Sequence, residues 1–478
     1  MTTLTPNPAP AARADEPQSL AGSSRRPRVT LIVGSLAGFM IGLDATVVAT
    51  ALPTIHATLH ASASTLGWTV SAYSLAFAAL ILTGTALGDK FGRRRVFLAG
   101  FTVFTLSSAA CALAPTATAL IVARAVQGAG GGIATPLGLV LITEAFPIHR
   151  RGAVVGAYGA IAGVAVGFGP VIGGAIVQGI AWPWVFWVNV PVGIILVTVG
   201  RRLLAESRGP SRRLDPVGLA LATGAVFAVT DALLRGPQAG WHSAEVLSLF
   251  GIGAALAAAF VRAERRLANP MIPPHLLANP MLRAAVTTRF LLFATILGAA
   301  FLVPQYLQLA HGFSPLSTGL GLLPFTGPMM LIAPVAGKVA DRLGDRVPIT
   351  AGFALSAVGF TLLGLTVTAT GGYLTVAGPL LLAGLGVGLA VPTTVSGSLR
   401  AVGPQRVSLA SGVGATLQNI GGVFGVATAA AVFAGSGSYL SPAGFVHGLR
   451  PALLALAILA ALGVLAGRAV RPSAITSP

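Results

Sequence analysis

The chain has 478 residues, of which 54% are hydrophobic and only 9% are charged, and its net charge is +18. Soluble proteins carry roughly 25% charged residues, so this composition excludes a soluble globular protein and predicts a polytopic membrane protein. The basic residues lie in short loops with few aromatic side chains beside them. We therefore interpret the positive charge as a consequence of membrane topology, and we expect no nucleic-acid partner.

Apolar runs of about 20 residues, the length that crosses the hydrocarbon core of a bilayer, follow one another along the chain. They predict an all-α integral membrane protein with about fourteen spans, preceded by a polar, disordered cytoplasmic tail at 1–28. The predicted spans are 29–51, 66–87, 96–113, 117–141, 152–178, 184–200, 216–235, 244–262, 284–309, 317–340, 347–368, 372–394, 408–434 and 446–467.

The distribution of lysine and arginine predicts the orientation of these spans. Only Arg235 and Arg450 fall on one side, whereas the basic groups around Arg25, Arg93, Arg150, Arg201, Arg262, Lys338, Arg400 and Arg468 fall on the other. Short loops rich in these residues stay in the cytoplasm. We therefore predict a multi-pass protein of the cell membrane with both termini cytoplasmic.

Two similar loops indicate an internal duplication. Gly84–Arg95 (GTALGDKFGRRR) follows the second predicted span, and Gly337–Arg346 (GKVADRLGDR) follows the tenth. If the seventh and eighth spans are an inserted pair, the two loops occupy equivalent places in two six-span halves. The predicted units are a six-helix bundle at 29–200, an inserted helix pair at 214–262, a second six-helix bundle at 284–470 and a cytoplasmic tail at 471–478. Parallel repeats that hold a substrate between them are typical of alternating-access transporters.

One acid and one base are predicted to lie within spans. A charged carboxylate is costly in the first span, so Asp44 is predicted to carry the coupled proton, a cationic substrate, or both in competition. The alternative is a structural partner or a helix cap near the outer end of that span. Arg124, in the fourth span, stays charged and would act on a nearby carboxylate. Its alternative role is packing and pairing with polar neighbours such as Gln127.

Five stretches together carry a resemblance to a known family. They are the two loops above, Leu43–Pro53 (LDATVVATALP), Arg124–Gly128 (RAVQG) and Gly167–Gly174 (GFGPVIGG), and the stretches Trp184–Pro191 and Tyr306–Gln308 also fit. In this order, from about Val29 to Val470, the chain resembles the major facilitator superfamily and, within it, the fourteen-span drug:proton antiporters. The first loop departs from the family pattern at Thr85, where a glycine is usual.

The resemblance implies roles for particular residues. It assigns Asp44 and Arg124 to proton coupling, and it associates the pattern Gly167, Gly169, Pro170, Gly173 and Gly174 with antiporters rather than symporters. The spacing of Gly159, Gly163 and Gly167 also favours close helix packing, and a proline can kink the helix. Ordinary tight packing is the alternative.

The charged residues of the two loops are predicted to act as conformational latches, because acid–base pairs at helix ends can favour one closed state. These residues are Asp89, Arg93, Arg94, Asp341 and Arg342. The alternative is that the loops are basic only because they face the cytoplasm.

Polar groups in or beside the spans are candidates for a substrate cavity: Gln127, Gln305, Tyr306, Gln308, Gln418, Asn419 and Asp231. Asp231 is four residues from Arg235, so a simple pair is the expected arrangement. Arg289, early in the ninth span, is expected to extend towards the cytoplasmic interface. His56 and His60 have helical metal-ligand spacing but lack further ligands, so no metal is predicted.

These observations predict a proton-coupled multidrug efflux antiporter that exports hydrophobic, in some cases cationic, compounds as a monomer. The alternatives are an exporter dedicated to one endogenous metabolite or antibiotic and, more remotely, a membrane-embedded enzyme. The sequence has no Gly-rich phosphate loop ending in Lys-Ser or Lys-Thr, so we predict the proton gradient as the energy source, without a cofactor. It also has no convincing nucleophile–base or metal cluster, which argues against an enzyme.

Overall fold

The computed structural model describes residues 25–209, 215–266, 279–401 and 407–470, together with the side chains of most of them. Most of these residues are helical, and no strand occurs among them. The helices are α1 (Arg25–Leu59), α2 (Ala63–Phe91), α3 (Arg93–Ala112), α4 (Ala117–Glu144), α5 (Ile148–Gly179), α6 (Trp184–Trp187), α7 (Asn189–Leu203), α8 (Pro216–Ala239), α9 (Ala244–Arg266), α11 (Pro280–Leu309), α12 (Pro315–Gly321), α13 (Leu323–Leu343), α14 (Arg346–Thr366), α15 (Leu374–Arg400), α16 (Val407–Ala434) and α17 (Pro442–Arg468).

In the part of the chain that the structure describes, 13 helices are long and apolar enough to cross a membrane. The number is 14 if α12 and α13, which meet at a bend of 43°, form one broken span. Both predictions, an all-α membrane fold and about fourteen spans, are confirmed. The predicted tails at 1–28 and 471–478 lie almost wholly outside the described residues.

The helix ends follow from local sequence. Ser62, Thr116 and Ser441 cap the starts of α2, α4 and α17 by accepting a hydrogen bond from a backbone N–H of the first turn. Gly92 ends α2 with φ 108°, and Gly344 ends α13 with φ 78°, conformations that residues with a Cβ rarely adopt. These two glycines allow the tight turns of the two similar loops.

The first helix is longer than its apolar run predicted. It passes through Pro53 and continues to Leu59, whereas the prediction ended at residue 51. A proline removes only one backbone donor, and neighbouring helices can compensate for that loss within a membrane. Asp44 therefore lies in the interior of α1, and the alternative that it caps the end of the helix is wrong.

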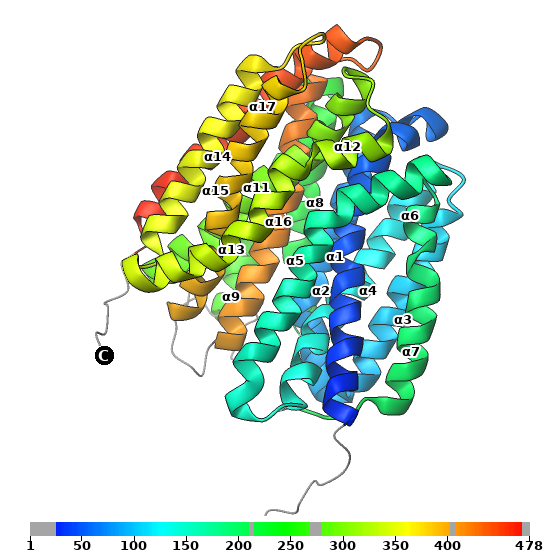
Figure 1. Cartoon of the computed structure of the whole chain (residues 1–478), viewed down its shortest axis with the longest axis vertical. Helices are drawn as coiled ribbons and strands as arrows, with labels where there is room; N and C mark the ends of the chain where they lie inside the picture. Colours follow the sequence, from blue (N-terminus) through cyan, green and yellow to red (C-terminus); the bar gives the residue numbers. More distant parts are fainter. Residues whose placement is uncertain (1–24, 210–214, 267–278, 402–406, 471–478) are drawn as a thin grey trace, which may run out of the picture.

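The helices form two bundles, with α1–α7 on one side of the molecule and α11–α17 on the other (Figure 1). Contacts between these halves are made by α2 with α16, by α1 with α11 and α12, and by α5 with α12 and α13. The additional helix α8 packs against α2 and α16, one helix from each half, and α9 packs against α8. The α8–α9 pair therefore lies along one seam between the halves.

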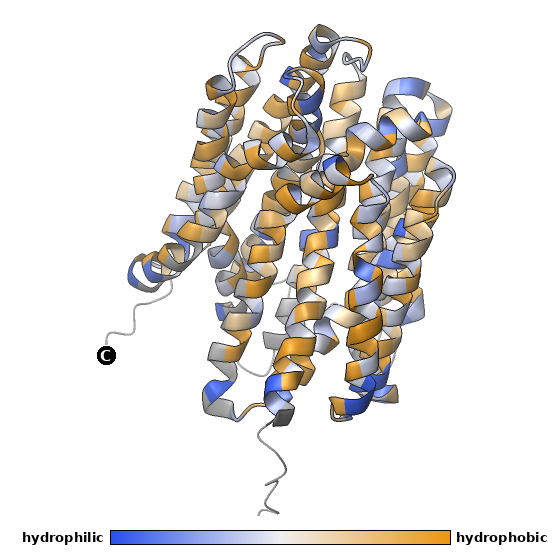
Figure 2. Cartoon of the chain, turned by 45° about the vertical axis from the view of Figure 1, so that its right-hand side comes forward, coloured by the Kyte–Doolittle hydropathy of each residue, from blue (hydrophilic) through white to orange (hydrophobic). Residues whose placement is uncertain are grey.

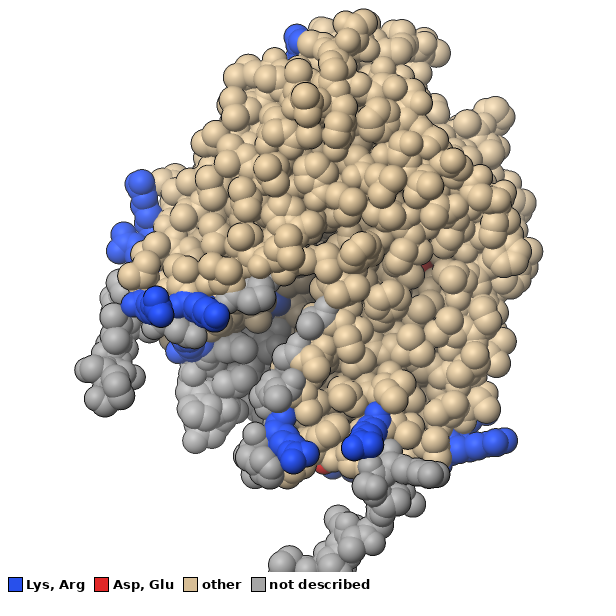
Figure 3. Space-filling model, viewed as in Figure 1, with Lys and Arg blue, Asp and Glu red and all other residues tan. Residues whose placement is uncertain are grey.

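One end of the bundle carries most of the basic side chains, and we call it the basic end. Lysine and arginine side chains gather there in the space-filling view (Figure 3). The exposed residues near the helix ends at this side are Arg28, Arg95, Arg201, Arg266 and Arg346. The first residue of α1 and the last residue of α17 both lie at the basic end (Figure 1). Between the two ends, the helices display mostly apolar residues (Figure 2). Such a belt with a basic rim is the surface of a multi-pass membrane protein.

The two halves are in close contact at the opposite end. Gln308 of α11 donates to the carbonyl of Thr50 in α1 at 2.9 Å, and Gln178 at the end of α5 accepts from the backbone N–H of Leu316 at 3.2 Å. The described conformation is therefore closed at the end opposite the arginines.

Candidate functional site

Four helices bring five polar side chains together inside the first half. Asp44 comes from α1, Ser108 from α3, Arg124 and Gln127 from α4, and Asn189 from the start of α7. Each is at most 1% exposed, so all five are removed from both water and lipid. We call these residues the buried polar network.

The carboxylate of Asp44 lies at the centre of this network. Arg124 donates to its Oδ2, so the predicted acid and base form an ion pair. Its Oδ1 accepts from Gln127 Nε2 at 2.8 Å and from Asn189 Nδ2 at 3.0 Å. Every one of these partners donates a hydrogen bond, and an ionised carboxylate is the form that only accepts hydrogen bonds. The arrangement therefore suits ionised Asp44.

The hydroxyl of Ser108 fixes the two amides that face Asp44. Its Oγ accepts from Gln127 Nε2 at 3.1 Å and from Asn189 Nδ2 at 2.9 Å, and it donates to the carbonyl of Phe186 at 2.9 Å. Each amide nitrogen has two hydrogens and uses one on Asp44 and one on Ser108. Neither nitrogen has a hydrogen left to donate elsewhere.

Arg124 is enclosed by aromatic rings. Its guanidinium lies 4.2 Å from the ring centre of Tyr73 and 5.6 Å from that of Phe186, a cation–π arrangement. Gly128 lies directly against the backbone of α2, because a Cβ there would come within 2.1 Å of the carbonyl oxygen of Tyr73. This close approach explains why a glycine four residues after Arg124 helps to place the guanidinium.

The geometry makes the ion pair sensitive to protonation. A buried pair is stable only while both charges are present, because removal of one leaves the other uncompensated in a medium of low dielectric. Protonation of Asp44 would remove the counter-charge of Arg124 and place an O–H opposite groups that only donate. Loss of the pair would remove a contact that joins α1 to α4 at this point.

Sequence reasoning found Asp44, Arg124 and Gln127 but missed Ser108 and Asn189. Asn189 stood within a stretch noted for its resemblance, and Ser108 lies within a predicted span. A polar residue inside an apolar span is a signal that it will seek a polar partner. If this criterion is applied to hydroxyl and amide side chains as well as to charged ones, it identifies both Ser108 and Asn189.

The glycine-rich part of α5 contacts both halves. A Cβ at Gly173 would lie 2.5 Å from the carbonyl oxygen of Val47 in α1, and one at Gly174 would lie 2.1 Å from that of Pro315 in α12. Gly167 and Gly169 are equally close to the side chains of Met330 and Thr46, and the carbonyl of Pro170 faces Gly319.

Two other glycines of α5 behave differently. Among the described residues, no atom would lie within 4 Å of a Cβ at Gly159 or Gly163, so the expectation of close packing at these two positions is wrong. The predicted antiporter motif lies where α5 meets α1 and α12, one turn beyond the glycines that were included only for their spacing.

Most predicted latch residues of the first loop are joined in one cluster. Arg93 donates to Asp89 Oδ1 from Nε at 2.9 Å and from Nη2 at 2.7 Å, and it also donates to Glu144 at the end of α4. The backbone N–H of Arg94 donates to Glu206 at 2.9 Å. These contacts join the basic ends of α2, α3 and α4 within one half. Glu144 and Glu206 were not predicted to take part.

The second loop uses an acid that the sequence did not single out. Asp345 is fully buried, accepts from Ser396 Oγ at 2.8 Å and lies 3.4 Å from Arg400 Nη1. Arg342 is exposed, and no ion pair joins it to another described side chain. The side chain of Asp341 lies outside what the structure describes. Among the described side chains of the second loop, Asp345 makes the buried contact.

The predicted cavity residues lie in several separate places. Gln127 belongs to the buried polar network, and Asp231 pairs with Arg235 at 2.9 Å, as expected. Gln305 accepts from Tyr439 Oη at 2.8 Å, and Tyr306 donates to the carbonyl of Thr368 at 2.9 Å, so both are engaged near the closed end.

Three further cavity candidates are only partly buried. Gln308 joins the halves as described above, and Gln418 and Asn419 lie on α16. Gln418 accepts from Arg289 Nη2 at 2.6 Å, and Asn419 Nδ2 donates to the carbonyl of Ala415 at 2.9 Å.

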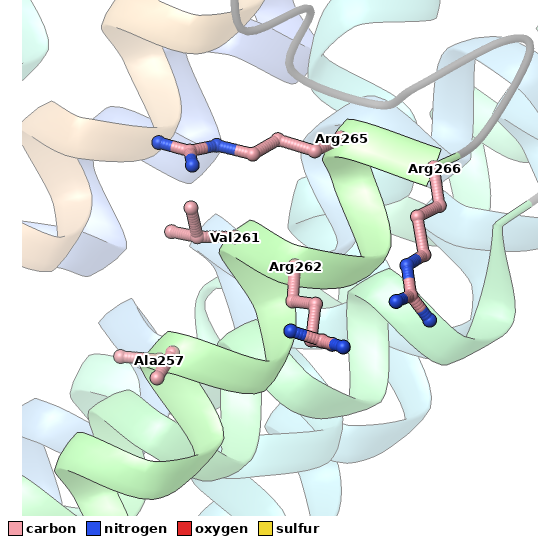
Figure 4. Close-up of a pocket in the computed structure, with 6 residues that line it drawn as sticks. Ala257, Val261, Arg262, Arg265 and Arg266 are labelled. Carbon is pink, nitrogen blue, oxygen red and sulfur yellow. The ribbon is translucent and has the colours of Figure 1, made fainter.

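A pocket of about 560 Å³ lies at the basic end of α9, away from all of these residues. Its lining consists of Ala257, Ala258, Val261, Arg262, Arg265 and Arg266. Arg265 extends to one side of the helix, while Arg262 and Arg266 extend to the other (Figure 4). The pocket lies on the outer helix of the additional pair, so it is not part of the buried polar network.

Comparisons with known proteins agree on one family. The sequence model described as Major Facilitator Superfamily matches residues 34–426. The chain is 35% identical to the multidrug resistance protein Stp of Mycobacterium tuberculosis over 86% of this chain and 76% of that protein. It is 33% identical to a methylenomycin A resistance protein of Streptomyces coelicolor over 93% and 94% of the two chains.

Other relatives extend this picture. The tetracenomycin C resistance and export protein of Streptomyces glaucescens is 33% identical over 72% of this chain and 65% of that protein. Among solved structures, the xylose transporter XylE from E. coli aligns with a TM-score of 0.62 at 16% identity, over 92% of this chain and 97% of XylE. This structural likeness establishes the fold.

Proposed function

This chain belongs to the major facilitator superfamily, and we propose that it exports small hydrophobic compounds in exchange for protons. Membership confirms the prediction of a transporter rather than an enzyme. Its relatives are named for multidrug resistance and for antibiotic resistance or export, which supports outward transport. The observation that carries proton coupling is the ion pair of Asp44 and Arg124, buried where two helices of one half meet.

In the proposed cycle, Asp44 takes up a proton and releases Arg124, and the packing of α1 and α4 changes. Loss of the proton on the other side restores the pair. The proton gradient supplies the energy, so no cofactor takes part. Arg124 is paired with the carboxylate of Asp44 in the described state. A cationic substrate would therefore have to displace the guanidinium of Arg124 to bind Asp44.

Alternating access needs a closure at each end. We propose that the glycine face of α5 closes the end opposite the arginines, through its contacts with α12. The cluster of Asp89, Arg93 and Glu144 then sets the geometry of the basic end. The basic end is proposed to face the cytoplasm of the cell membrane, with both chain ends on that side and one chain forming the pathway.

A narrower function is the second candidate. Two of the relatives are named for resistance to single antibiotics, methylenomycin A and tetracenomycin C. An exporter dedicated to one such compound would have the same fold and the same buried polar network. A panel of unrelated dyes and antibiotics separates the two candidates, because only a multidrug exporter lowers the accumulation of several.

Dye accumulation in cells without their own pumps tests the proposal. We expect cells that make this protein to accumulate less dye than cells with an empty vector, and a protonophore to abolish the difference. Accumulation should be measured with one anionic and one cationic dye. Export that persists at full rate in the presence of the protonophore would contradict proton coupling.

Asp89→Asn tests the proposed role of the first loop. Asp89 is 7% exposed, and a partly buried ion pair contributes about 1 kcal/mol, so we expect export to slow by a few-fold. The initial rate of dye efflux from preloaded cells is the measurement. Arg342→Gln is the control, because that side chain is exposed. An unchanged rate in Asp89→Asn would mean that the loop is basic only for topology.

Gly174→Ala tests the proposed closure by α5. A Cβ there meets the carbonyl of Pro315, and overpacking typically costs about 1–3 kcal/mol, so the closed state should become less populated by about tenfold. A cysteine placed at Thr50 in a Cys111→Ser background should then react faster with an impermeant maleimide. Gly163→Ala has open space and is the matched control. Equal labelling in both variants would refute the closure.

A further inference from the structure

A second buried arginine lies in the other half of the molecule. Arg289 is nine residues after the start of α11, about 14 Å along the helix axis at 1.5 Å per residue, and it is 6% exposed. The expectation that it extends to the cytoplasmic interface is therefore wrong. The proposed transport mechanism does not use this residue.

The guanidinium of Arg289 has few partners. Its Nη2 donates to Gln418 Oε1 at 2.6 Å, whereas Nε and Nη1 have no acceptor among the described residues. Arginine stays protonated in proteins, so these donors cannot be removed by loss of a proton. A buried charge without a counter-charge carries a penalty of several kcal/mol.

Four described acids in helix interiors or at helix ends pair with other arginines, so they do not neutralise the charge of Arg289. Asp44 is held by Arg124, Asp89 by Arg93, and Asp345 lies beside Arg400. Asp231 is held by Arg235 near the closed end. The position of Arg289 thus favours binding of an anionic group that these acids do not supply, such as that of a bound compound.

The surroundings of Arg289 are shaped around the guanidinium. A Cβ at Gly414 would come within 2.3 Å of Nη1, so the side chain lies directly on the backbone of α16. Gln418, one turn further along the same face of α16, holds Nη2. A glycine and an amide at this spacing leave room for the charged group and orient it.

The position is beside the seam between the halves. The helices that carry these residues, α11 and α16, also make contacts to the first half, with α1 and α2. Phe293, one turn from Arg289, is only partly buried, as are Gln418 and Asn419. In transporters built from two repeats, substrate binds between the repeats near the middle of the membrane.

We propose that Arg289 and Gln418 form a subsite for the anionic group of the exported compound, which makes hydrophobic carboxylic acids the preferred substrates. The subsite rests on the proposed export function and specifies its substrate class. The guanidinium forms charge-assisted hydrogen bonds to a carboxylate, while the neighbouring Phe293 offers apolar contact. The ion pair of Asp44 remains for the proton.

Binding of two related dyes to the purified full-length protein tests the subsite directly. Fluorescein is anionic and rhodamine 123 is cationic, and both contain the same xanthene ring system. We expect wild type to bind fluorescein more tightly than rhodamine 123 in fluorescence anisotropy titrations. Arg289→Gln should weaken binding of fluorescein by about tenfold or more and leave that of rhodamine 123 unchanged.

Two further variants separate a ligand role from a structural one. Arg289→Lys keeps the positive charge and should retain part of the affinity for fluorescein. Arg283→Gln removes an exposed arginine from the same helix and should change neither affinity. Equal loss of both dyes in Arg289→Gln, no loss of either, or a wild type that binds neither dye would overturn the subsite.

Transport measurements with the same dyes keep the two proposals apart. Selective binding of fluorescein without protonophore-sensitive export would support the subsite and contradict the proposed function. Protonophore-sensitive export of both dyes that is unchanged in Arg289→Gln would support the proposed function and contradict the subsite.

Discussion

Asp44→Asn is expected to abolish proton-driven export while the protein still folds. Asparagine has nearly the same shape as the protonated side chain, but it cannot release a proton, so Arg124 is never re-paired. Its amide also places donors opposite Gln127 and Asn189, which already donate towards this position. We expect the rate of dye export to fall by more than about tenfold, each factor of ten corresponding to about 1.4 kcal/mol in a barrier.

Reconstituted vesicles are the suitable measurement for this variant. Wild-type uptake into inverted vesicles should rise when a proton gradient is imposed, whereas uptake by Asp44→Asn should be independent of the gradient. Asp231→Asn is the matched control, because it also removes a carboxylate from a membrane-spanning helix. Unlike Asp44, the carboxylate of Asp231 pairs with an exposed arginine, Arg235. Gradient-driven export by Asp44→Asn at the wild-type rate would refute the proton-carrying role.

Arg124→Gln is expected to destabilise the protein as well as to uncouple it. The substitution leaves the carboxylate of Asp44 buried without its counter-charge, and breaking a buried pair in this way costs about 3–5 kcal/mol. The cation–π contact with Tyr73 is also lost. Proton-driven export should fall together with the temperature at which the protein unfolds.

The single cysteine provides the readout of unfolding. Cys111 is fully buried beside Gln127, so a thiol-reactive fluorophore should label it only when the helices separate. We expect Arg124→Gln to be labelled at a lower temperature than wild type. The double variant Asp44→Asn with Arg124→Gln should recover much of this loss, because no buried charge is left unpaired. A double variant no more stable than Arg124→Gln would contradict a mainly electrostatic role for the pair.

The sequence predicted functional roles for Asp44 and Arg124 individually, because both are charged residues within apolar spans. Asp44 and Arg124 stood out because charges are rare within apolar spans and are expensive there. That they contact each other was not predictable, because 80 residues separate them in the chain. The same limitation hid Ser108 and Asn189, whose polarity was visible but whose partners lie on other helices.

The direction of a side chain was the least predictable feature. The position of Arg289 early in its span predicted its depth in the membrane but not which helix it faces. In the structure Arg289 turns inwards onto Gly414, and Asp345 makes the buried contact of the second loop. The spacing of Gly159 and Gly163 likewise predicted a packed face, and both positions have open space around them.

The sequence alone determined the membrane location, the number of spans and the family. Hydrophobic length and loop charge act locally, and the family motifs are contiguous stretches, so none of these needs knowledge of a distant neighbour. Only the tertiary structure decided that Asp44 pairs with Arg124 within one half and that Arg289 has no acid bonded to it among the described residues. Whether a buried charge is compensated depends on which helices pack together, because the partner is supplied from elsewhere in the chain.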